Sequence, residues 1–527
     1  MSSCFGGTEK EGRPFQRPDT LVLLLLFLVF AAVLVRTAWV SDDAYITFRT
    51  VDNFIHGYGL TWNTDERVQA YTNPLWMFLV SGLYFCTREL FFSVIILSIL
   101  ISLAAAAGLA WGISVSPRAA LLGLVLLISS KAFVDYSTSG LENPLTHLLA
   151  AGFLIVYLRR EFTAKTIFYL SLLAGLAAFN RMDTVLFYLP ALAYSLLKLK
   201  GRKALWAILG GFVPFLLWEL FSLLYYGFPF PNSAYAKLAA GLGSRQLVRQ
   251  GLFYLLNSLR ADPLTLLAVA SGLLVAFVLK DRRFLALAAG ILLYLTYVVR
   301  IGGDFMSGRF LAAPFFFAVA LVTQIRLRSK TVSIAVLLAT AVFGVTRPYA
   351  PFKRGADYSQ TSFDEHGIAD ERGFYYQYAG LLKSGPGIKL PLLHREAGHE
   401  ARLKGGVIIN HAIGYFGFFA GPGVHIVDPH GLSDPLLARL PTFYSENWRI
   451  GHFARVIPAG YVETLRDRKW LFQDKNLAQY YSHLTRIIRG PLWSIPRFRE
   501  IIKMNTGRYN SLVDRELYRY PSGKRGS

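Results

Sequence analysis

Long apolar runs follow one another between residues 21 and 346, and they limit what this chain can fold into. Residues 21–40 form one such run, and a helix of that length spans roughly 30 Å, the thickness of a bilayer core. Further runs occupy residues 91–113 and 204–226. Soluble proteins rarely carry so many long runs. The sequence therefore predicts a polytopic α-helical membrane protein.

Basic residues gather in short segments between the runs, at residues 159–165, 198–203, 280–283 and 326–330. Such clusters mark the cytoplasmic side of a membrane. Alternating the sides gives about 11 transmembrane helices, with residues 74–85 as a shallow or re-entrant helix; the alternative is that residues 119–134 do not cross. We attribute the net charge of +22 to these loops and to lipid contacts rather than to nucleic acid.

The composition changes after residue 346. Residues 347–527 contain no apolar run near 18 residues and are rich in Gly, Pro, Tyr and Arg. The pieces VIIN and VHIVD are β-branched runs bounded by glycines, which is typical of short strands. We expect a multispanning domain over residues 1–346 and an extracytoplasmic α/β soluble domain over residues 347–527. The two cysteines, Cys4 and Cys86, are not expected to pair.

Polar residues are densest in residues 41–73, directly after the first apolar run. This segment opens with two adjacent carboxylates, Asp42 and Asp43. Ionisable groups at the mouth of a membrane helix are costly unless they line a wet cavity or serve a site. The alternative is that Asp43 only caps the following helix. We interpret the segment as a catalytic loop, with Asp42 favoured as the base because Asp43 occupies the capping position.

Other polar clusters lie at the predicted outer ends of different runs, so they are expected on the same side as the catalytic loop. Arginine and lysine can hold a phosphate group. The candidates for that role are Arg49, Arg67, Arg181, Lys237 and Arg309. Amides, carboxylates and ring nitrogens can bind sugar hydroxyls of a donor or acceptor. The candidates for that role are Asn63, Glu66, Gln69, Tyr71, Asn73, Glu142, Asn143, Asp183, Asn232, Asp304, Asp428, His430, Asp434, Arg449 and His452.

Each of these candidates has a structural alternative. Glu142 and Asn143 precede a proline and can cap a helix, and Arg181 and Asp183 can form a local pair. The histidines can be surface or packing residues. No nucleotide-binding loop, dinucleotide fingerprint or serine-hydrolase motif is recognisable. No metal site and no cofactor is predicted; a divalent cation remains an open option.

The pattern DDAYITFR, followed by WN and ERVQAYTNPLW, resembles the mycobacterial terminal arabinofuranosyltransferase family. The similarity extends to GGDFMSGRFLAAP at residues 302–314, to DPHGLSDPLLARLP at 428–441 and to WRIGHFARVIPAGY at 448–461. That family belongs to the GT-C glycosyltransferases, membrane enzymes that use polyprenyl-phosphate sugars. The resemblance implies a catalytic carboxylate at Asp42 or Asp43, and it leaves the sugar open.

The resemblance implies transfer of a sugar, such as arabinofuranose or another pentofuranose, from a polyprenyl phosphate to a cell-envelope glycan. The expected location is the bacterial cytoplasmic (inner) membrane, with the site facing outward and membrane lipid as a further partner. One alternative is a GT-C transferase for a hexose. Another is a transporter or flippase for a lipid-linked glycan, which predicts charged residues at the midplane of the spans. Ionisable residues instead gather at the ends of the runs, which favours the enzyme over a transporter or a non-catalytic scaffold.

Overall fold

The computed structural model describes residues 17–326, 329–347, 349–351, 363–383, 394–445 and 448–520. The chain divides into two compact units, each built from several stretches. The first comprises Met1–Ser41, Phe91–Phe215 and Ser244–Leu390, and the second comprises Asp42–Leu90, Leu216–Gly243 and Pro391–Ser527. The division at residue 346 that composition suggests stays a prediction. The basic cluster at 326–330 and the N-terminal tail lie partly outside the described residues.

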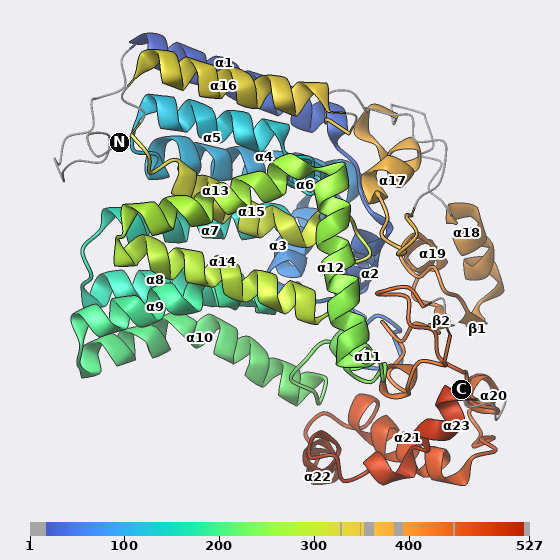
Figure 1. The fold of residues 1–527 in the computed structure, drawn as a ribbon. Helices are drawn as coiled ribbons and strands as arrows, with labels where there is room; N and C mark the ends of the chain where they lie inside the picture. Colours follow the sequence, from blue (N-terminus) through green and yellow to red (C-terminus); the bar gives the residue numbers. More distant parts are fainter. Residues whose placement is uncertain are drawn as a thin grey trace. The chain divides into compact units, whose positions relative to one another are not determined.

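The first unit is helical (Figure 1). Its longer helices are α1 (Arg17–Thr37), α4 (Phe91–Ala107) with η2 (Gly108–Ile113), α5 (Pro117–Ser129), α7 (Asn143–Arg159), α8 (Ala164–Asn180), α9 (Val185–Leu199), α12 (Ser244–Ala261), α13 (Pro263–Leu279), α14 (Arg282–Arg300), α15 (Ala312–Val322) and α16 (Lys330–Thr346). Shorter elements are α6 (Lys131–Asp135), η3 (Met182–Thr184), η4 (Arg309–Leu311), α17 (Glu371–Ala379) and η5 (Leu381–Lys383). Helix α10 (Arg202–Tyr225) contributes residues to both units.

Helix α15 is the centre of the first unit. Its sequence, AAPFFFAVALV, is apolar all round, and every one of its residues is buried, as expected for a helix with no solvent face. Helix α13 approaches it closely at Gly272, where a Cβ atom would lie 2.6 Å from the carbonyl oxygen of Ala318. Small residues allow this kind of backbone contact between membrane helices.

The apolar runs found in the sequence are helices in the structure. Of the helices among the described residues, five are long and apolar enough to cross a membrane, or six if α12 and α13 are taken together as one broken span. Several shorter apolar helices, such as α5 and α16, accompany them. This supports a polytopic helical membrane protein. The number of crossings, predicted as eleven, stays a prediction.

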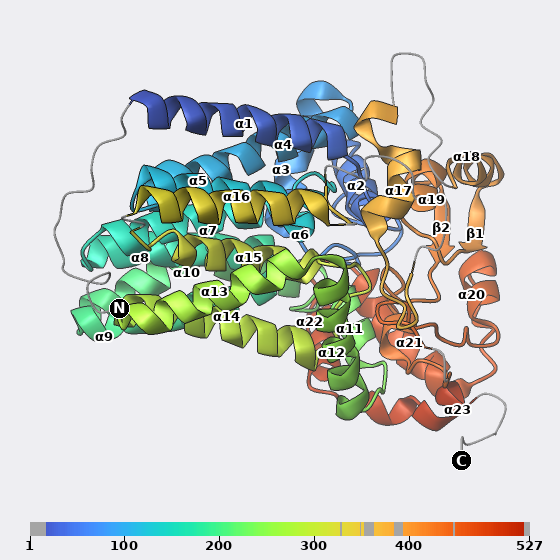
Figure 2. The same ribbon diagram turned by 45° about the horizontal axis from the view of Figure 1, so that its top comes forward.

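Helices α12 and α13 meet at Asp262 with a bend of 108°. Figures 1 and 2 both show α12 running across the direction of α13 and α14. The Asp262 carboxylate holds the bend: it accepts hydrogen bonds from the Ala132 backbone amide (2.9 Å) and the Thr265 hydroxyl (2.5 Å), and it pairs with Arg347. The buried charge therefore has the partners that burial requires.

The second unit contains α2 (Asp42–Ile55), α3 (Pro74–Thr87), the end of α10, α11 (Asn232–Leu238), α18 (Arg395–Lys404), α19 (Tyr415–Ala420), η6 (Leu437–Arg439), α20 (Tyr461–Asp467), α21 (Lys475–Ile488), α22 (Ile495–Asn505), η7 (Asn510–Leu512) and α23 (Arg515–Arg519). The two predicted strands are present as β1 (Gly406–Ile409) and β2 (Val424–Val427). They are parallel neighbours. Read by itself, the glycine-rich segment between the two runs suggests a simple turn. That prediction is wrong, because α19 lies between the strands, and parallel strands need such a crossover.

Arg497 joins α22 to the end of α10. It is buried, and its guanidinium donates to the carbonyl oxygens of Leu224 (2.7 Å) and Tyr225 (2.8 Å). The last carbonyls of a helix have no partner within the helix. Arg497 therefore supplies the C-terminal cap of α10, and Asn505 adds a hydrogen bond to the Gly227 carbonyl oxygen (2.8 Å).

Candidate active site

Asp42 is the first residue of α2, and its side chain is partly buried. One carboxylate oxygen, Oδ1, accepts a hydrogen bond from the backbone amide of Tyr415 (2.7 Å) at the start of α19. Burial raises the pKa of the Asp42 carboxyl to about 6, although the backbone amides of Tyr415 and Gly414 favour the charged form. A carboxylate with a pKa this close to neutrality is suited to take a proton from a hydroxyl group.

Gly414 lies directly against this carboxylate. A Cβ atom at position 414 would come within 2.5 Å of Asp42 Oδ2. Only glycine leaves that space open, so the residue keeps Asp42 in its present position. Asp43 occupies the first turn of α2 and is also partly buried. The helix already begins at Asp42, so Asp43 lies within its first turn and not at the capping position that the sequence suggested.

Arg49 has a different environment from the one a phosphate-binding residue needs. Its side chain is 1% exposed. Nε donates to the carbonyl oxygen of Trp62 (2.9 Å), Nη1 to that of Gly417 (2.7 Å) and Nη2 to that of Val424 (2.7 Å). The guanidinium also lies 4.2 Å from the centre of the Trp62 ring. These contacts tie α2 to α19 and β2, so we assign Arg49 to the framework of the second unit.

The predicted sugar-binding residues of the catalytic loop also hold the loop together. Asn63 exchanges hydrogen bonds with the backbone of Ile426, accepting one of 3.0 Å from its amide and donating one of 3.2 Å to its carbonyl oxygen. Further polar contacts between side chains are short: Glu66 with Arg489 (3.2 Å), Gln69 with Ser222 (3.1 Å), Tyr71 with Tyr226 (2.8 Å) and Asn73 with Thr47 (3.2 Å). The loop is therefore a cross-linked structure, as a precisely held site requires.

In the first unit, the structure brings together five of the predicted site residues from the ends of different helices. The Glu142 carboxylate is fully buried and contacts Nη1 of Arg181 (2.8 Å) and Nη2 of Arg309 (3.2 Å). Arg181 also pairs with Asp183, and Arg309 with Asp304. Two positive and three negative groups make up this ion cluster. The predicted local pairing of Arg181 and Asp183 is thus one part of a larger network.

The two arginines of the ion cluster are held differently. Arg181 binds both oxygens of Asp183, at 2.8 Å and 3.0 Å, and stacks 4.3 Å from the Phe310 ring centre. Arg309 lies 3.2 Å from Glu142 and 3.7 Å from Asp304. The bidentate pair fixes Arg181, whereas the longer contacts leave Arg309 the better placed of the two to rearrange around an anion. Asn143, the neighbour of Glu142, is buried, and its Oδ1 accepts no hydrogen bond in the described part of the chain.

The aspartates predicted from the C-terminal motif are both buried. Asp428 accepts hydrogen bonds from the amides of His430 (2.8 Å), Leu432 (2.6 Å) and Ser433 (3.0 Å), so it shapes the turn that follows it. Asp434 accepts from the Tyr461 hydroxyl (2.9 Å) and from two backbone amides. Burial and then the charge of Glu66 raise the pKa of the Asp434 carboxyl to about 7.

The histidines predicted from the same region form a row. The ring of His430 lies 5.2 Å from that of His411 and 5.4 Å from that of His452. Burial lowers the pKa of His430 to about 3, and the neighbouring His452, His411 and arginines add to the effect. Arg449, also predicted, is partly buried beside this row. His430 is therefore neutral at pH 7.

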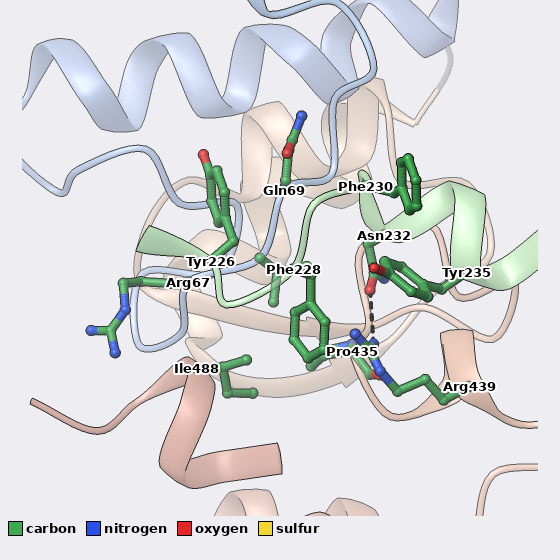
Figure 3. A pocket seen from close by; sticks show the side chains of 11 residues that line it. Arg67, Gln69, Tyr226, Phe228, Phe230, Asn232, Tyr235, Pro435, Arg439 and Ile488 are labelled. Carbon is green, nitrogen blue, oxygen red and sulfur yellow. Dashed lines mark hydrogen bonds between the residues drawn. The ribbon is translucent and has the colours of Figure 1, made fainter. Parts of the chain in front are cut away.

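A small pocket in the second unit includes three of the predicted residues, Arg67, Gln69 and Asn232, together with an arginine that the sequence did not single out (Figure 3). That residue, Arg439, is buried, donates to Asn232 Oδ1 (3.3 Å) and stacks on the Phe228 ring at 4.1 Å. The free volume of the pocket is about 10 Å³, which is enough for about one water molecule. Lys237, on α11, is exposed and does not line it.

Arg439 is not among the site residues predicted from the sequence, although it belongs to the quoted motif DPHGLSDPLLARLP. Among the described residues, no group of three or more His, Cys, Asp or Glu side chains is arranged to hold a metal ion. Cys86 is a free thiol, and Cys4 lies outside the described residues.

No protein-family model matches the chain. Two curated proteins match the chain, and both carry the name terminal β-(1→2)-arabinofuranosyltransferase. The protein from Mycobacterium tuberculosis is 27% identical over 517 residues, covering 80% of this chain and 81% of that protein. The protein from Corynebacterium glutamicum is 26% identical over 405 residues, covering 66% of this chain and 57% of that protein. The predicted resemblance to this family, and with it the prediction of a membrane glycosyltransferase, is confirmed.

Two solved structures are similar at lower identity. ArnT from Cupriavidus metallidurans, bound to undecaprenyl phosphate, is 13% identical with a TM-score of 0.42, covering 80% of this chain and 77% of ArnT. The oligosaccharyltransferase AglB from Archaeoglobus fulgidus, in complex with an inhibitory peptide and a dolichol-phosphate, is 13% identical with a TM-score of 0.44, covering 79% of this chain and 65% of AglB.

Proposed function

We propose that this glycosyltransferase transfers a pentofuranose, with arabinofuranose as the first candidate, from a polyprenyl-phosphate donor to a glycan of the cell envelope. The observation that carries the proposal is the similarity to an arabinofuranosyltransferase over four fifths of both chains. A similarity that spans nearly the whole protein supports a shared reaction more strongly than one limited to a single motif, although the sugar itself depends on contacts within the site.

Asp42 is the proposed general base. In the transfer, an acceptor hydroxyl attacks the anomeric carbon of the donor sugar, the bond from that carbon to the phosphate oxygen breaks, and the polyprenyl phosphate leaves. Asp42 takes the hydroxyl proton. Two features support this role: the pKa of about 6, and Asp42 Oδ1 being fixed by the Tyr415 amide. A base held in one orientation reacts faster than a mobile one.

Arg309 is the proposed contact for the donor phosphate. Its guanidinium presents several donors in one plane, which matches phosphate geometry. The carboxylates of Glu142 and Asp304 offset its charge before the donor binds. Arg49 is removed from this role by its three backbone contacts, and we assign Arg181 the task of positioning Glu142 and Asp183.

A transporter is the less supported alternative. In the first unit, the buried charged side chains among the described residues include Lys131, Asp135, Glu142, Asp262 and Asp304, and each lies at or near a helix end. Charged residues that serve a transport path gather instead near the midplane of the spans.

The proposed setting is the bacterial cytoplasmic membrane, with the C-terminal segment outside.

The test is transfer by the purified full-length protein in nanodiscs. A synthetic polyprenyl-phosphate arabinofuranose serves as donor and an arabinan oligosaccharide as acceptor, and mass spectrometry follows the gain of one pentose. Parallel reactions with polyprenyl-phosphate hexoses define the sugar. Transfer of pentose supports the proposal. Transfer of hexose alone would show that the transferred sugar is a hexose and not a pentofuranose. Absence of transfer from every polyprenyl-phosphate donor would overturn the proposal.

A further inference from the structure

Helix α12 carries a stripe of exposed apolar side chains. The stripe consists of Val248, Leu252, Leu256 and Leu259, each between 37% and 50% exposed. Their spacing of four, four and three residues places them on one face of the helix. The buried residues of α12 include Gly251 and Tyr254, which lie on other faces. An apolar stripe this long on the outside of a protein marks a surface that meets something apolar.

Helix α12 lies across the ends of two apolar helices of the first unit. At its end it turns by 108° into α13. Along its length it crosses α14, where a Cβ atom at Gly251 would come within 2.6 Å of Val299 Cα, one residue before α14 ends at Arg300. Both ribbon views show the crossing (Figures 1 and 2). If α13 and α14 cross the membrane, α12 lies parallel to the membrane surface, level with their ends.

The stripe continues an apolar surface on those helices. On α13, Leu267, Leu274 and Phe277 are 52%, 62% and 70% exposed. On α14, Leu292 is 52% exposed. Side chains of this kind on apolar helices of a membrane protein face lipid, because the bilayer replaces the protein core as their apolar environment. The apolar surface therefore extends from these helices onto α12.

The charges on α12 fit a lipid headgroup layer. The helix holds three arginines, Arg245, Arg249 and Arg260, and no carboxylate. At 100° per residue, Arg249 and Arg260 lie roughly 60° and 80° from Leu252 around the helix axis, which places them at the edge of the stripe. Basic side chains in this position reach lipid phosphates while their stems follow the apolar boundary. A cavity of about 290 Å³ adjoins this edge, and Leu256, Asn257, Arg260, Asp364, Glu365 and His366 are among the residues that line it. Arg260 lies 3.7 Å from the Glu365 carboxylate, but both side chains are largely exposed, so this surface pair is weak and leaves Arg260 able to reach a lipid phosphate.

We propose that α12 is an interfacial helix, embedded along one face in the membrane surface and bound by its arginines to anionic lipid headgroups. The stripe of Val248, Leu252, Leu256 and Leu259 lies at the boundary between headgroups and acyl chains. Arg249 and Arg260 lie in the headgroup layer. This helix then fixes the depth of the first unit in the membrane, since it joins α13 through a bend that buried Asp262 holds.

The test uses the full-length protein in liposomes, with Cys4 and Cys86 replaced by serine. Single cysteines at Leu252 and Leu256 are labelled with an environment-sensitive fluorophore. Gln246, which is exposed and lies roughly 120° from Leu252 on the same helix, gives the matched control. Size-exclusion chromatography of each labelled variant confirms that it is folded.

Brominated acyl chains should quench the labels at positions 252 and 256, and aqueous iodide should quench the label at position 246. The labels at 252 and 256 should also show blue-shifted emission. Equal behaviour of all three labels would overturn the proposal by placing the stripe in water. Labels at 252 and 256 that neither quencher reaches would also overturn it, by showing that protein covers the stripe.

The headgroup contact is tested separately with Arg249→Gln and Arg260→Gln. Adding phosphatidylglycerol to phosphatidylcholine liposomes should increase bromolipid quenching at position 252, and the two substitutions together should remove that increase. A response to phosphatidylglycerol that survives both substitutions would overturn the assignment of these arginines.

Discussion

At the scale of single residues, Asp42 decides whether the proposed mechanism is correct. Asp42→Asn keeps an oxygen that can accept from the Tyr415 amide and removes the basic carboxylate. Transfer should fall by about 10²–10⁴-fold, the usual contribution of a general base, while the melting temperature stays near that of the parent. Asp43→Asn is the neighbouring control and should cost less activity. If Asp43→Asn abolishes transfer and Asp42→Asn does not, the two roles are exchanged.

The pH dependence of transfer follows from the same residue. A base must be deprotonated to act, and the pKa of Asp42 is raised to about 6. We therefore expect kcat/KM to be constant above that pH and to fall about tenfold per pH unit below it. The residual activity of Asp42→Asn should lack this acid limb. If kcat/KM of Asp42→Asn still falls at low pH as in the parent, the titrating group is a residue other than Asp42.

Gly414→Ala tests the space around the Asp42 carboxylate. The added methyl group would collide with Asp42 Oδ2, and relieving such a contact in a packed region costs about 1–3 kcal/mol. The expected results are slower transfer and a lower melting temperature. Gly423→Ala is the matched control, because nothing lies within 4 Å of a Cβ atom at that position. Equal effects of the two substitutions would contradict the close contact.

The ion cluster separates two arginines that look alike in the sequence. Arg309→Lys keeps the charge and loses the planar set of donors, so the KM for the donor should rise with little change in melting temperature. Arg181→Lys breaks the bidentate contact with Asp183, so it should mainly lower the melting temperature. An unchanged donor KM in Arg309→Lys would remove this residue from the phosphate site.

At the scale of secondary-structure elements, Arg49 joins α2, α19 and β2. Arg49→Met would leave the buried carbonyl oxygens of Trp62, Gly417 and Val424 without this donor, at about 1–3 kcal/mol for each group left unsatisfied. A drop of several degrees in melting temperature is expected, measured against the exposed Lys404→Met control. The donor KM of the folded fraction should not change; an increase would restore Arg49 as a phosphate contact.

The elements that the sequence predicted well are those with a strong local pattern. The apolar runs are helices, and VIIN and VHIVD pair as strands. The sequence alone predicts no helix over Ser244–Ala261, because three arginines interrupt its apolar residues. The spacing from Val248 to Leu259 is the signal that could have revealed α12. The role of Arg49 was not predictable, because its partners Gly417 and Val424 are 368 and 375 residues away, and no local pattern encodes them.

At the scale of the whole molecule, the orientation in the membrane remains the prediction that every outward-facing role depends on. We replace Cys4 and Cys86 with serine and introduce a cysteine either at Leu403, which is 90% exposed on α18, or at Lys203, at the start of α10. An impermeant maleimide added to intact cells should label position 403, and it should label position 203 only after the membrane is opened. The opposite pattern would place the C-terminal segment inside.

Arg497, which caps α10, is synthesised long after that helix. The helix ends 272 residues before the side chain that completes it, and at the usual rate of synthesis that stretch takes on the order of tens of seconds to emerge from the ribosome. During this interval the carbonyls of Leu224 and Tyr225 must rely on water or a chaperone. A chain cut short before residue 497 would therefore leave the last carbonyls of this apolar helix permanently without their cap.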